Sequence, residues 1–393
     1  CRKYRQMTNS EVRAPLNVLV NASTIIKGGG IQVAASFIAQ TTLVESNINW
    51  QYCLSAQVAE ELSNLKVELP QFHLFETSPS RSQAQRRRLA DLEKTLSPSA
   101  VFTIFGPAYV RFAAPHLCGV AACWVTHSTW LAYKALPSGS ARLRNFVTCG
   151  YQGLWFGSAD RWVVEASNAK GGLVKRIGLE ADNIAVVPNT CAAIFPAAGI
   201  ADAVAPKEGE TVRLLYVTAY YPHKNLELIP AVAAALRDRD ATRDYEFIIT
   251  LPGDEPALGR IKQRARELNV EKSINNVGRV SLNEVISLYD NAHICFMPSL
   301  LETFSASYPE AMAMGRPIVA SDLGFARAVC SDAAVYFEPT SADDAAQKIV
   351  SLSNDQPKWN ELIRRGKEVL NSLPTARQKH DMYVDLLRDL TDH

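Results

Sequence analysis

Short apolar runs alternate with amphipathic stretches along most of the chain. The runs that predict strands are residues 16–20, 50–55, 100–104, 120–126, 161–165 and 184–187, followed by 214–217, 246–250, 274–277, 293–297, 317–320 and 334–337. Apolar residues at helical spacing separate most of them, as in residues 31–43 and 82–96. Strands that are apolar throughout and alternate with helices are typical of parallel sheets covered on both faces. The pattern therefore predicts an α/β fold.

This rhythm stops at Pro188 and resumes at Leu214. Residues 192–207 lie between them, are rich in alanine, proline and glycine, and show no periodicity, as is typical of a linker. We therefore predict a first domain over residues 15–190, a linker over 191–212, a second domain over 213–372, and a final helix in 373–393 that crosses back to the first domain. Two such α/β halves in tandem predict two Rossmann-like, doubly wound domains that face each other across a cleft. Because such sheets bind ligands outside the carboxyl ends of their strands, loops of both domains would gather at this cleft.

Composition narrows the class of protein. A chain of 393 residues suits two domains better than one, and 47% hydrophobic with 21% charged residues is ordinary for a globular protein. The 41 basic and 40 acidic residues balance to a net charge of +1, which argues against a nucleic-acid partner. No apolar run approaches the roughly 18–20 residues that would cross a bilayer.

The N-terminus and the cysteines favour a cytoplasmic location. Residues 1–14 are polar and basic, which predicts a loose tail rather than a signal peptide or a lipoprotein start at Cys1, and Met7 is a candidate true start. The eight cysteines form no CxxC pair, and several lie within apolar runs. Free buried thiols in a reducing compartment fit this better than disulfides or zinc.

The stretch from Pro298 to Ser321 carries the strongest chemical signal. It reads as a strand, a loop holding Glu302, a helix opening with Glu310, and a further strand. The helix is expected to begin between Ala306 and Pro309, since proline suits a first turn. The amides around Ser305, Ala306 and Ser307 would then form an anion site suited to a diphosphate. A carboxylate at Glu310 can accept hydrogen bonds from two ribose hydroxyls.

This stretch resembles the donor-binding motif of the family-4 retaining glycosyltransferases with the GT-B fold, in which two glutamates flank seven residues. Glu302 and Glu310 match the glutamates, and the surrounding pattern is matched by Phe304, Ala311, Gly315, Arg316 and Pro317. The resemblance implies a GT-B fold and transfer of a sugar from a nucleotide diphosphate donor with no cofactor. It implies that Glu302 holds the sugar hydroxyls and Glu310 the ribose. A solvated loop glutamate and a helix-dipole glutamate are the alternative interpretation.

The resemblance extends to other segments of the second half. Lys224 matches a lysine that holds the donor phosphates, whereas Ala219 stands where the family usually has an arginine. One phosphate contact is therefore absent or supplied elsewhere. Arg279, in the segment Asn276-Val-Gly-Arg279, falls in a loop that resembles the one cradling the nucleobase.

Three features of the first half fit the same family. Gly28, Gly29 and Gly30 resemble its glycine-rich loop, although a bare tight turn would look alike. His127, predicted at the end of a strand, matches a histidine that contacts the donor sugar. Asn189 matches a segment closing the first domain, where we expect a hinge.

Two further patterns are interpreted as structural or left open. Asp238 and Asp240 have the spacing of a metal motif found in glycosyltransferases of another fold, but they lie in a charged run, so we expect no metal. The segment 86–88 is three arginines on one predicted helix. It is either a solvated face or part of a basic and aromatic surface for anionic lipid, together with Trp130, Lys134, Arg142, Arg144, Trp155 and Phe156.

The sequence thus predicts a retaining hexosyltransferase that moves a sugar to a hydroxyl of a saccharide or lipid-linked saccharide, with peripheral contact at the inner membrane face. The sequences of the segments around Lys224 and from Glu302 to Glu310 resemble those of bacterial surface-polysaccharide transferases. The predicted catalytic residues are Glu302, His127 and Lys224. A nucleotide-sugar epimerase of the same fold and a non-catalytic nucleotide-sugar sensor are the alternatives.

Overall fold

The computed structural model describes residues 15–192 and 194–392, so the predictions for Cys1, Met7 and the rest of the segment 1–14 lie outside the described residues. The chain divides into two compact units. One runs up to Gly119 and takes in the segment from Val384 on, and the other spans Val120–Tyr383. Residues 120–190, which the sequence analysis assigns to the first domain, belong by their contacts to the second unit. The predicted domain boundaries stay a prediction.

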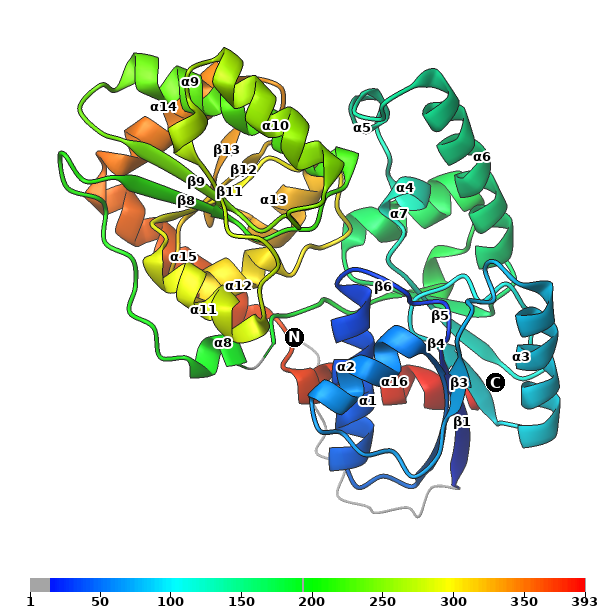
Figure 1. Ribbon diagram of the computed structural model, residues 1–393. Helices are drawn as coiled ribbons and strands as arrows, with labels where there is room; N and C mark the ends of the chain where they lie inside the picture. The colour runs from blue at the N-terminus through cyan, green and yellow to red at the C-terminus, as the bar shows by residue number, and fades with distance from the viewer. Residues whose placement is uncertain (1–14, 193, 393) are drawn as a thin grey trace. The chain divides into compact units, whose positions relative to one another are not determined.

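The first unit is built on parallel strands. Its elements are β1 (Leu16–Ala22), α1 (Gly30–Leu43), β2 (Ile48–Ser55), α2 (Ala56–Asn64), β3 (His73–Phe75), α3 (Gln83–Leu96), β4 (Ala100–Thr103) and β5 (His116–Val120). These strands pair in parallel in the order β3-β2-β1-β4-β5. Helices α1 and α2 lie to one side of this sheet and α3 to the other (Figure 1). Both faces are covered, as the unbroken apolar runs predict.

The second unit begins with a series of helices and one strand pair. Its elements up to the second sheet are α4 (Cys123–Thr126), α5 (Trp130–Lys134), α6 (Gly139–Phe156), β6 (Arg161–Val164), α7 (Ser167–Ile177), η1 (Ala181–Asn183), β7 (Ile184–Val186) and α8 (Ile194–Ala197). Strands β6 and β7 pair in parallel, with Trp162 opposite Ile184. Glu165 and Asn189 follow these two strands at their carboxyl ends.

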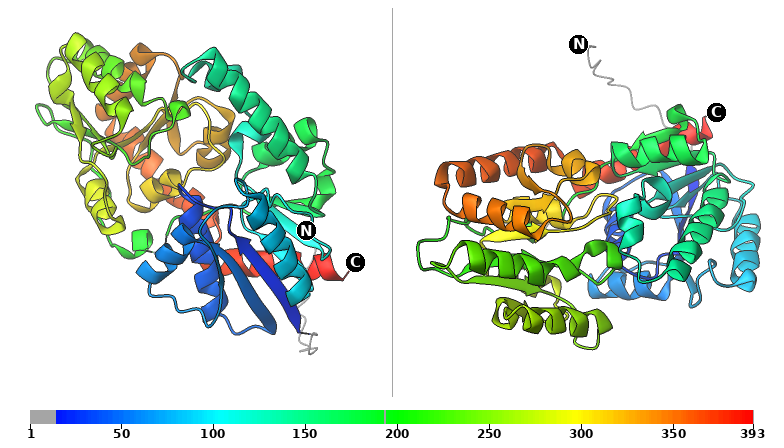
Figure 2. Two further views of the ribbon diagram at one scale, coloured as in Figure 1. Left: turned by 45° about the vertical axis from the view of Figure 1, so that its right-hand side comes forward. Right: turned by 90° about the horizontal axis from the view of Figure 1, so that it is seen from above.

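The second sheet has six parallel strands in the order β10-β9-β8-β11-β12-β13. Its elements are β8 (Val212–Tyr216), η2 (Pro222–Lys224), η3 (Leu226–Leu228), α9 (Ile229–Arg239), β9 (Tyr245–Ile249), α10 (Pro256–Glu267), η4 (Glu271–Ser273), β10 (Ile274–Asn276), α11 (Leu282–Asn291), β11 (Ile294–Met297), α12 (Ser307–Ala313), β12 (Ile318–Ser321), α13 (Gly324–Cys330), β13 (Ala334–Phe337), α14 (Ala342–Ser353), α15 (Gln356–Ser372) and α16 (Ala376–Thr391). Helices α9, α10 and α14 cover one face, and α11, α12 and α15 cover the other (Figures 1 and 2). A single core of buried residues fills the space between the layers.

The segment that precedes this sheet is fixed to it by hydrogen bonds. Ala203 N donates to Gly315 O at 3.0 Å, and the indole of Trp359 donates to Ala203 O at 2.8 Å. The buried guanidinium of Arg316 donates to Ala201 O at 2.6 Å. Residues 201–203 of the predicted linker are therefore held firmly against the second sheet.

The predicted strand over residues 120–126 is wrong. The strand there is β5, which ends at Val120, and residues 123–126 form the one-turn helix α4. His116 breaks the apolar pattern at the start of β5, yet its imidazole lies buried beside the hydroxyl of Thr103 at 2.8 Å. Because His116 forms its hydrogen bond inside the core, a polar residue can begin this buried strand, and the hydrophobic pattern did not predict it.

Candidate functional site

The two glutamates follow one strand at the carboxyl edge of the second sheet. β11 ends at Met297, Glu302 lies in the loop after it, and α12 begins at Ser307, within the predicted interval. β8 and β11 are neighbouring parallel strands, so the segments that follow them meet at the same edge. Lys224 follows β8 and Glu302 follows β11. The topology therefore brings these two residues together.

Lys224 and Glu302 form a nearly buried ion pair. Lys224 Nζ donates to Glu302 Oε1 at 2.5 Å, and the two side chains are 15% and 11% exposed. Burial disfavours the Lys224 ammonium, but the Glu302 carboxylate outweighs burial and raises the pKa of Lys224 above its ordinary value. The lysine is therefore a fixed positive charge at the sheet edge.

The hydroxyls of Ser299 and Tyr216 form a short chain of hydrogen bonds that ends at the Glu302 carboxylate. Ser299 Oγ donates to Glu302 Oε1 at 2.8 Å, and Tyr216 Oη lies 2.6 Å from Ser299 Oγ. Tyr216 and Ser299 are both buried. The sequence analysis missed these two residues, since an isolated serine and a strand tyrosine carry no signal without the fold.

His127 lies against the loop that carries Glu302. It caps the C-terminus of α4 rather than ending a strand, which corrects the predicted location. Its Nε2 donates to the main-chain oxygen of Glu302 at 2.6 Å. Burial lowers the pKa of His127, so the ring is neutral at pH 7. The ring positions the Glu302 loop, and its predicted contact with a donor sugar stays a prediction.

The turn that presents Lys224 is locked from several sides. Asn225 adopts a φ of 58° and its amide donates to Pro298 O and Pro339 O, each at 3.2 Å. Leu300 N donates to His223 O at 2.7 Å. Burial lowers the pKa of His223 to about 4, so His223 is no second cation for a phosphate at neutral pH.

Glu310 lies in the first turn of α12 with an unusual ionisation. Burial raises the pKa of its carboxyl to about 7, against a hydrogen bond from Tyr289 Oη to Glu310 Oε2 at 3.1 Å. The Glu310 side chain is half-buried, and its carboxyl accepts one hydrogen bond from a tyrosine hydroxyl. A ligand with hydroxyl donors would favour the charged form.

The loop between the two glutamates contains one buried side chain, followed by residues whose main-chain amides lie at the start of α12. Phe304 is buried in the core of the second unit. Ser305 has a φ of 62°, and Ala306 and Ser307 open α12. The side chain of Phe304 thus anchors the loop, while the amides of the following residues lie at the helix start as predicted.

The remaining predicted donor residues lie on exposed backbone. Arg279 is exposed and follows Gly278, whose φ is 84°. Ala219 is exposed at the end of the segment after β8. Gly28, Gly29 and Gly30 belong to the first unit, where Gly28 has a φ of 74° and Gly30 begins α1. A Cβ at Gly30 would come within 3.3 Å of the Phe105 ring, whereas Gly29 borders open space.

Asn189 holds a buried charge of α16. Lys379 Nζ donates to Asn189 Oδ1 at 2.6 Å and lies 4.0 Å from Glu165 Oε1. Burial raises the pKa of Glu165 and lowers that of Lys379. The polar contact of Asn189 was not foreseen, and its expected hinge role stays a prediction.

Asp238 and Asp240 are engaged with their own surroundings. Asp238 pairs with Arg237 at 2.7 Å. Asp240 accepts hydrogen bonds from Thr242, from Tyr245 Oη at 2.8 Å and from Arg243. Among the described residues, no group of three or more histidine, cysteine, aspartate or glutamate side chains is placed to hold a metal ion.

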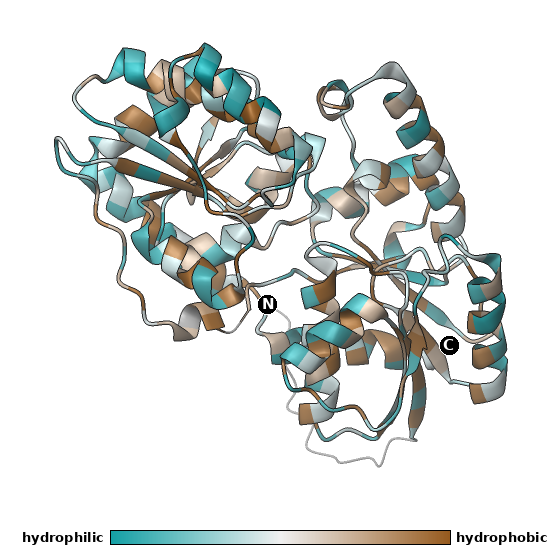
Figure 3. Cartoon of the chain, in the orientation of Figure 1, coloured by the Kyte–Doolittle hydropathy of each residue, from teal (hydrophilic) through white to brown (hydrophobic). Residues whose placement is uncertain are grey.

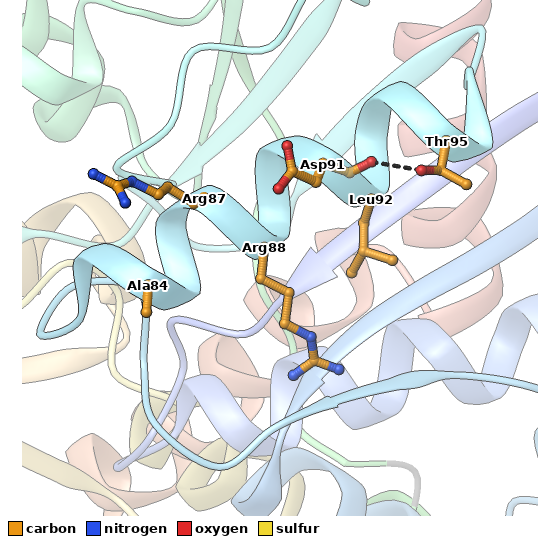
Figure 4. A pocket seen from close by; sticks show the side chains of 6 residues that line it. All are labelled: Ala84, Arg87, Arg88, Asp91, Leu92 and Thr95. Atoms are coloured by element: carbon orange, nitrogen blue, oxygen red, sulfur yellow. Dashed lines mark hydrogen bonds between the residues drawn. The ribbon is translucent and has the colours of Figure 1, made fainter.

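The arginine segment 86–88 lies on α3, beside a hollow of about 430 Å³ (Figure 4). The hollow is lined by Ala84, Arg87, Arg88, Asp91, Leu92 and Thr95. Arg88 donates to Leu74 O at 2.8 Å and covers the Phe75 ring, and Arg86 donates to Pro79 O. No predicted site residue lines this hollow. Phe156, expected on a lipid surface, is fully buried, so that part of the surface prediction is wrong.

Comparison with known proteins shows what the second half of the chain is similar to. Residues 201–369 match the family model described as glycosyl transferases group 1. This segment contains Lys224, Arg279, Glu302 and Glu310. All four residues therefore lie in a segment that is similar to the glycosyl transferases of group 1.

Similarity to known proteins in sequence and in fold extends beyond residues 201–369. An O-antigen chain mannosyltransferase of Salmonella typhimurium is 24% identical over 215 residues, 55% of this chain and 52% of the relative. A glycosyltransferase structure from Rickettsia africae superposes with a TM-score of 0.71 at 15% identity, covering 95% of this chain and 98% of that one. An Anabaena protein solved with UDP and glucose gives 0.68 at 14% identity, with 95% and 99% covered. The predicted GT-B fold class is confirmed.

The chain spans about half the length of the Salmonella relative that it matches. The structural likeness covers nearly the whole chain but, at these identities, concerns the fold. What the site does therefore rests on its own geometry.

Proposed function

We propose that this protein is a retaining glycosyltransferase that moves a hexose from a nucleotide diphosphate sugar to a hydroxyl acceptor. The observation that supports it best is the Lys224–Glu302 ion pair at the carboxyl edge of the second sheet, in the segment similar to the glycosyl transferases of group 1. The cation is suited to bind the diphosphate of a donor, and the carboxylate is suited to accept hydrogen bonds from the sugar hydroxyls. Glu310 would hold the ribose, and the amides of Ser305, Ala306 and Ser307 would hold the diphosphate, with Arg279 as a further donor contact.

The reaction breaks the bond between the sugar's anomeric carbon and the diphosphate and forms a bond from that carbon to the acceptor oxygen. In same-face substitution, the acceptor hydroxyl's proton passes to the departing phosphate oxygen. Lys224 stabilises the negative charge that grows on that phosphate, which is where a preorganised cation acts most. His127, neutral and already donating to the Glu302 loop, keeps the carboxylate in place. No cofactor or metal enters this scheme.

The names of the relatives suggest which donors to test first. One relative is named a mannosyltransferase of an O-antigen chain, and one structural neighbour was solved with UDP and glucose. We therefore propose a saccharide or lipid-linked saccharide acceptor in surface-polysaccharide synthesis. We also propose a cytoplasmic location with peripheral contact at the inner membrane face. No described helix is long and apolar enough to cross a bilayer.

The test is a panel of mannosyl and glucosyl nucleotide donors incubated with and without hydroxyl acceptors, read by mass spectrometry and by NMR of the anomeric proton. The expected result is an acceptor product with the donor's anomeric configuration, lost in Glu302→Gln. A new nucleotide sugar formed without acceptor would instead identify an epimerase. Tight donor binding with no product from any acceptor would identify a sensor.

A further inference from the structure

Helix α6 presents a row of large apolar side chains to solvent. Leu143, Phe146, Val147 and Leu154 are 66%, 67%, 62% and 79% exposed. Apolar and hydrophilic positions are interleaved along this helix in Figure 3. Exposed apolar side chains gathered on one element mark an interaction surface far more often than isolated ones do.

The row follows one face of the helix. At about 100° per residue, Leu143, Phe146, Val147 and Leu154 fall on a single stripe, with Gly150 in its middle. A Cβ at Gly150 would meet nothing within 4 Å, so the stripe stays open there. The opposite side of the helix carries the buried Phe156. The apolar stripe thus points away from the core.

Basic residues flank this stripe on both sides. Arg142 and Arg144 lie at its two edges by the same helical spacing. Arg142 also donates to Tyr133 O at 3.1 Å and Lys134 O at 3.4 Å, which holds the exposed Lys134 beside the first turn of α6. Residues 120–159 contain no aspartate or glutamate. The whole segment around the stripe is therefore purely cationic.

We propose that this apolar stripe of α6 inserts into the interface of an anionic lipid bilayer, with Lys134, Arg142 and Arg144 at the level of the lipid phosphates. This deepens the proposed membrane contact, and so rests on the proposed function, by naming the surface that makes it. An amphipathic helix with apolar and basic sides binds by buried apolar area plus attraction to anionic lipid. Long cationic side chains at the stripe's edges can reach the phosphates while their stems lie on the acyl region.

The charge pattern favours lipid over a second copy of this chain. Two stripes packed against each other would bring Arg142, Arg144 and Lys134 of one copy toward the same cations of the other. No carboxylate in residues 120–159 would compensate them. Like charges across an interface oppose association, whereas an anionic headgroup layer neutralises every one of these cations.

The experiment is cosedimentation of the full chain with vesicles of phosphatidylcholine alone and with added phosphatidylglycerol, at low and high salt, without donor or acceptor. The protein should bind the anionic vesicles and release with salt. The double variant Phe146→Gln with Leu154→Gln should bind at least about tenfold more weakly, given the apolar area lost. Arg144→Gln should lose most of the preference for phosphatidylglycerol. Gly150→Leu, which extends the stripe, should bind more tightly.

Thr148→Gln is the matched control, because Thr148 is exposed on α6 but outside the stripe. Unchanged circular dichroism would show that all variants keep the helix. No binding to anionic vesicles, or equal binding by the double variant, would overturn the proposal. So would a dimer in sedimentation velocity that the double variant abolishes, since the stripe would then be a self-association surface. Vesicle binding needs no turnover, so it can succeed or fail independently of sugar transfer to a soluble acceptor.

Discussion

Single residues at the sheet edge are coupled more closely than their spacing in sequence suggests. Lys224 pairs with Glu302, Ser299 donates to the same carboxylate, and Tyr216 contacts Ser299. In the proposed function, the donor diphosphate competes with Glu302 for the lysine. Binding of the donor would therefore release the carboxylate for the sugar hydroxyls, which couples the two predicted roles through one ion pair.

Lys224→Ala should lower turnover by about 2–4 kcal/mol, or roughly thirty- to a thousandfold, by analogy with the loss of one preorganised charge-stabilising donor. Donor affinity should fall less, because charge on the phosphate grows toward the transition state. With Ala219 in place of the usual arginine and His223 neutral, Arg279 is the other predicted cation left to share this load. Single-turnover rates and calorimetric affinities on one preparation measure both quantities.

Lys224→Ala leaves the Glu302 carboxylate buried without its cation. The double variant Lys224→Ala with Glu302→Gln removes this unpaired charge and is therefore the matched control. If Lys224→Ala alone turned over within about threefold of the parent, a range far below that loss, the lysine would have no catalytic role.

Glu310 predicts a pH-dependent nucleotide affinity. Its folded pKa of about 7 lies above the ordinary value of 4.5, so the folded protein retains a proton that the unfolded chain has lost, and this group's contribution to stability falls as pH rises from 4.5 to about 7. Ribose hydroxyls prefer the ionised carboxylate. Nucleoside diphosphate affinity should therefore rise between about pH 6 and about pH 8 as the carboxyl ionises.

Calorimetry of the same diphosphate with Glu310→Gln provides the comparison, because the nucleotide's own ionisation is common to both proteins. The variant should bind roughly ten- to a hundredfold more weakly at high pH and lose the pH-dependent difference. An equal pH dependence in both proteins would remove Glu310 from ribose recognition.

Among the elements, the hydrophobic pattern located strands and helices well but not their polar exceptions. The start of α12 and all six strands of the second sheet were predicted from the sequence. β5 was misplaced because His116 is satisfied by Thr103 inside the core. Ser299 and Tyr216 were missed because their proximity to Glu302 depends on strand order, which periodicity does not contain.

The glycine of Gly315-Arg316-Pro317 should be indispensable to the approach of the segment 201–203. Gly315 has a φ of 62°, and a Cβ there would lie 2.3 Å from Asp202 Oδ1 and 2.9 Å from Asp202 Cα. Gly315→Ala should cost at least about 2 kcal/mol, because backbone strain and overlap add. Urea denaturation measures this, with Gly324→Ala as the control, since a Cβ at Gly324 meets nothing within 4 Å. Equal midpoints for the two variants would show that the segment moves aside freely.

For the molecule as a whole, alternation of apolar runs and helices predicted two α/β domains, and the family resemblance specified the GT-B fold. The structural neighbours share this fold over 95% of the chain. The surface was less predictable. The sequence analysis grouped Phe156 with the aromatics of a lipid surface, yet Phe156 is buried. It did not name Leu143, Val147 or Leu154, which are exposed. Periodicity defines an apolar face but does not say whether protein, lipid or water lies against it.

Helix α16 belongs to both compact units, since the division falls between Tyr383 and Val384 within it. Its buried Lys379 is held by Asn189 and Glu165, whose side chains follow β7 and β6. Lys379→Met would leave the Glu165 carboxyl buried without its cation, and should destabilise the protein by about 3–5 kcal/mol. Lys379→Met combined with Glu165→Gln removes both charges and should recover most of that loss, because the cost comes from the unpaired group. Urea unfolding followed by tryptophan fluorescence compares the two. If the double variant were no more stable than Lys379→Met alone, the lysine would act through Asn189 or through packing, and the Glu165 pair would contribute nothing to anchoring α16.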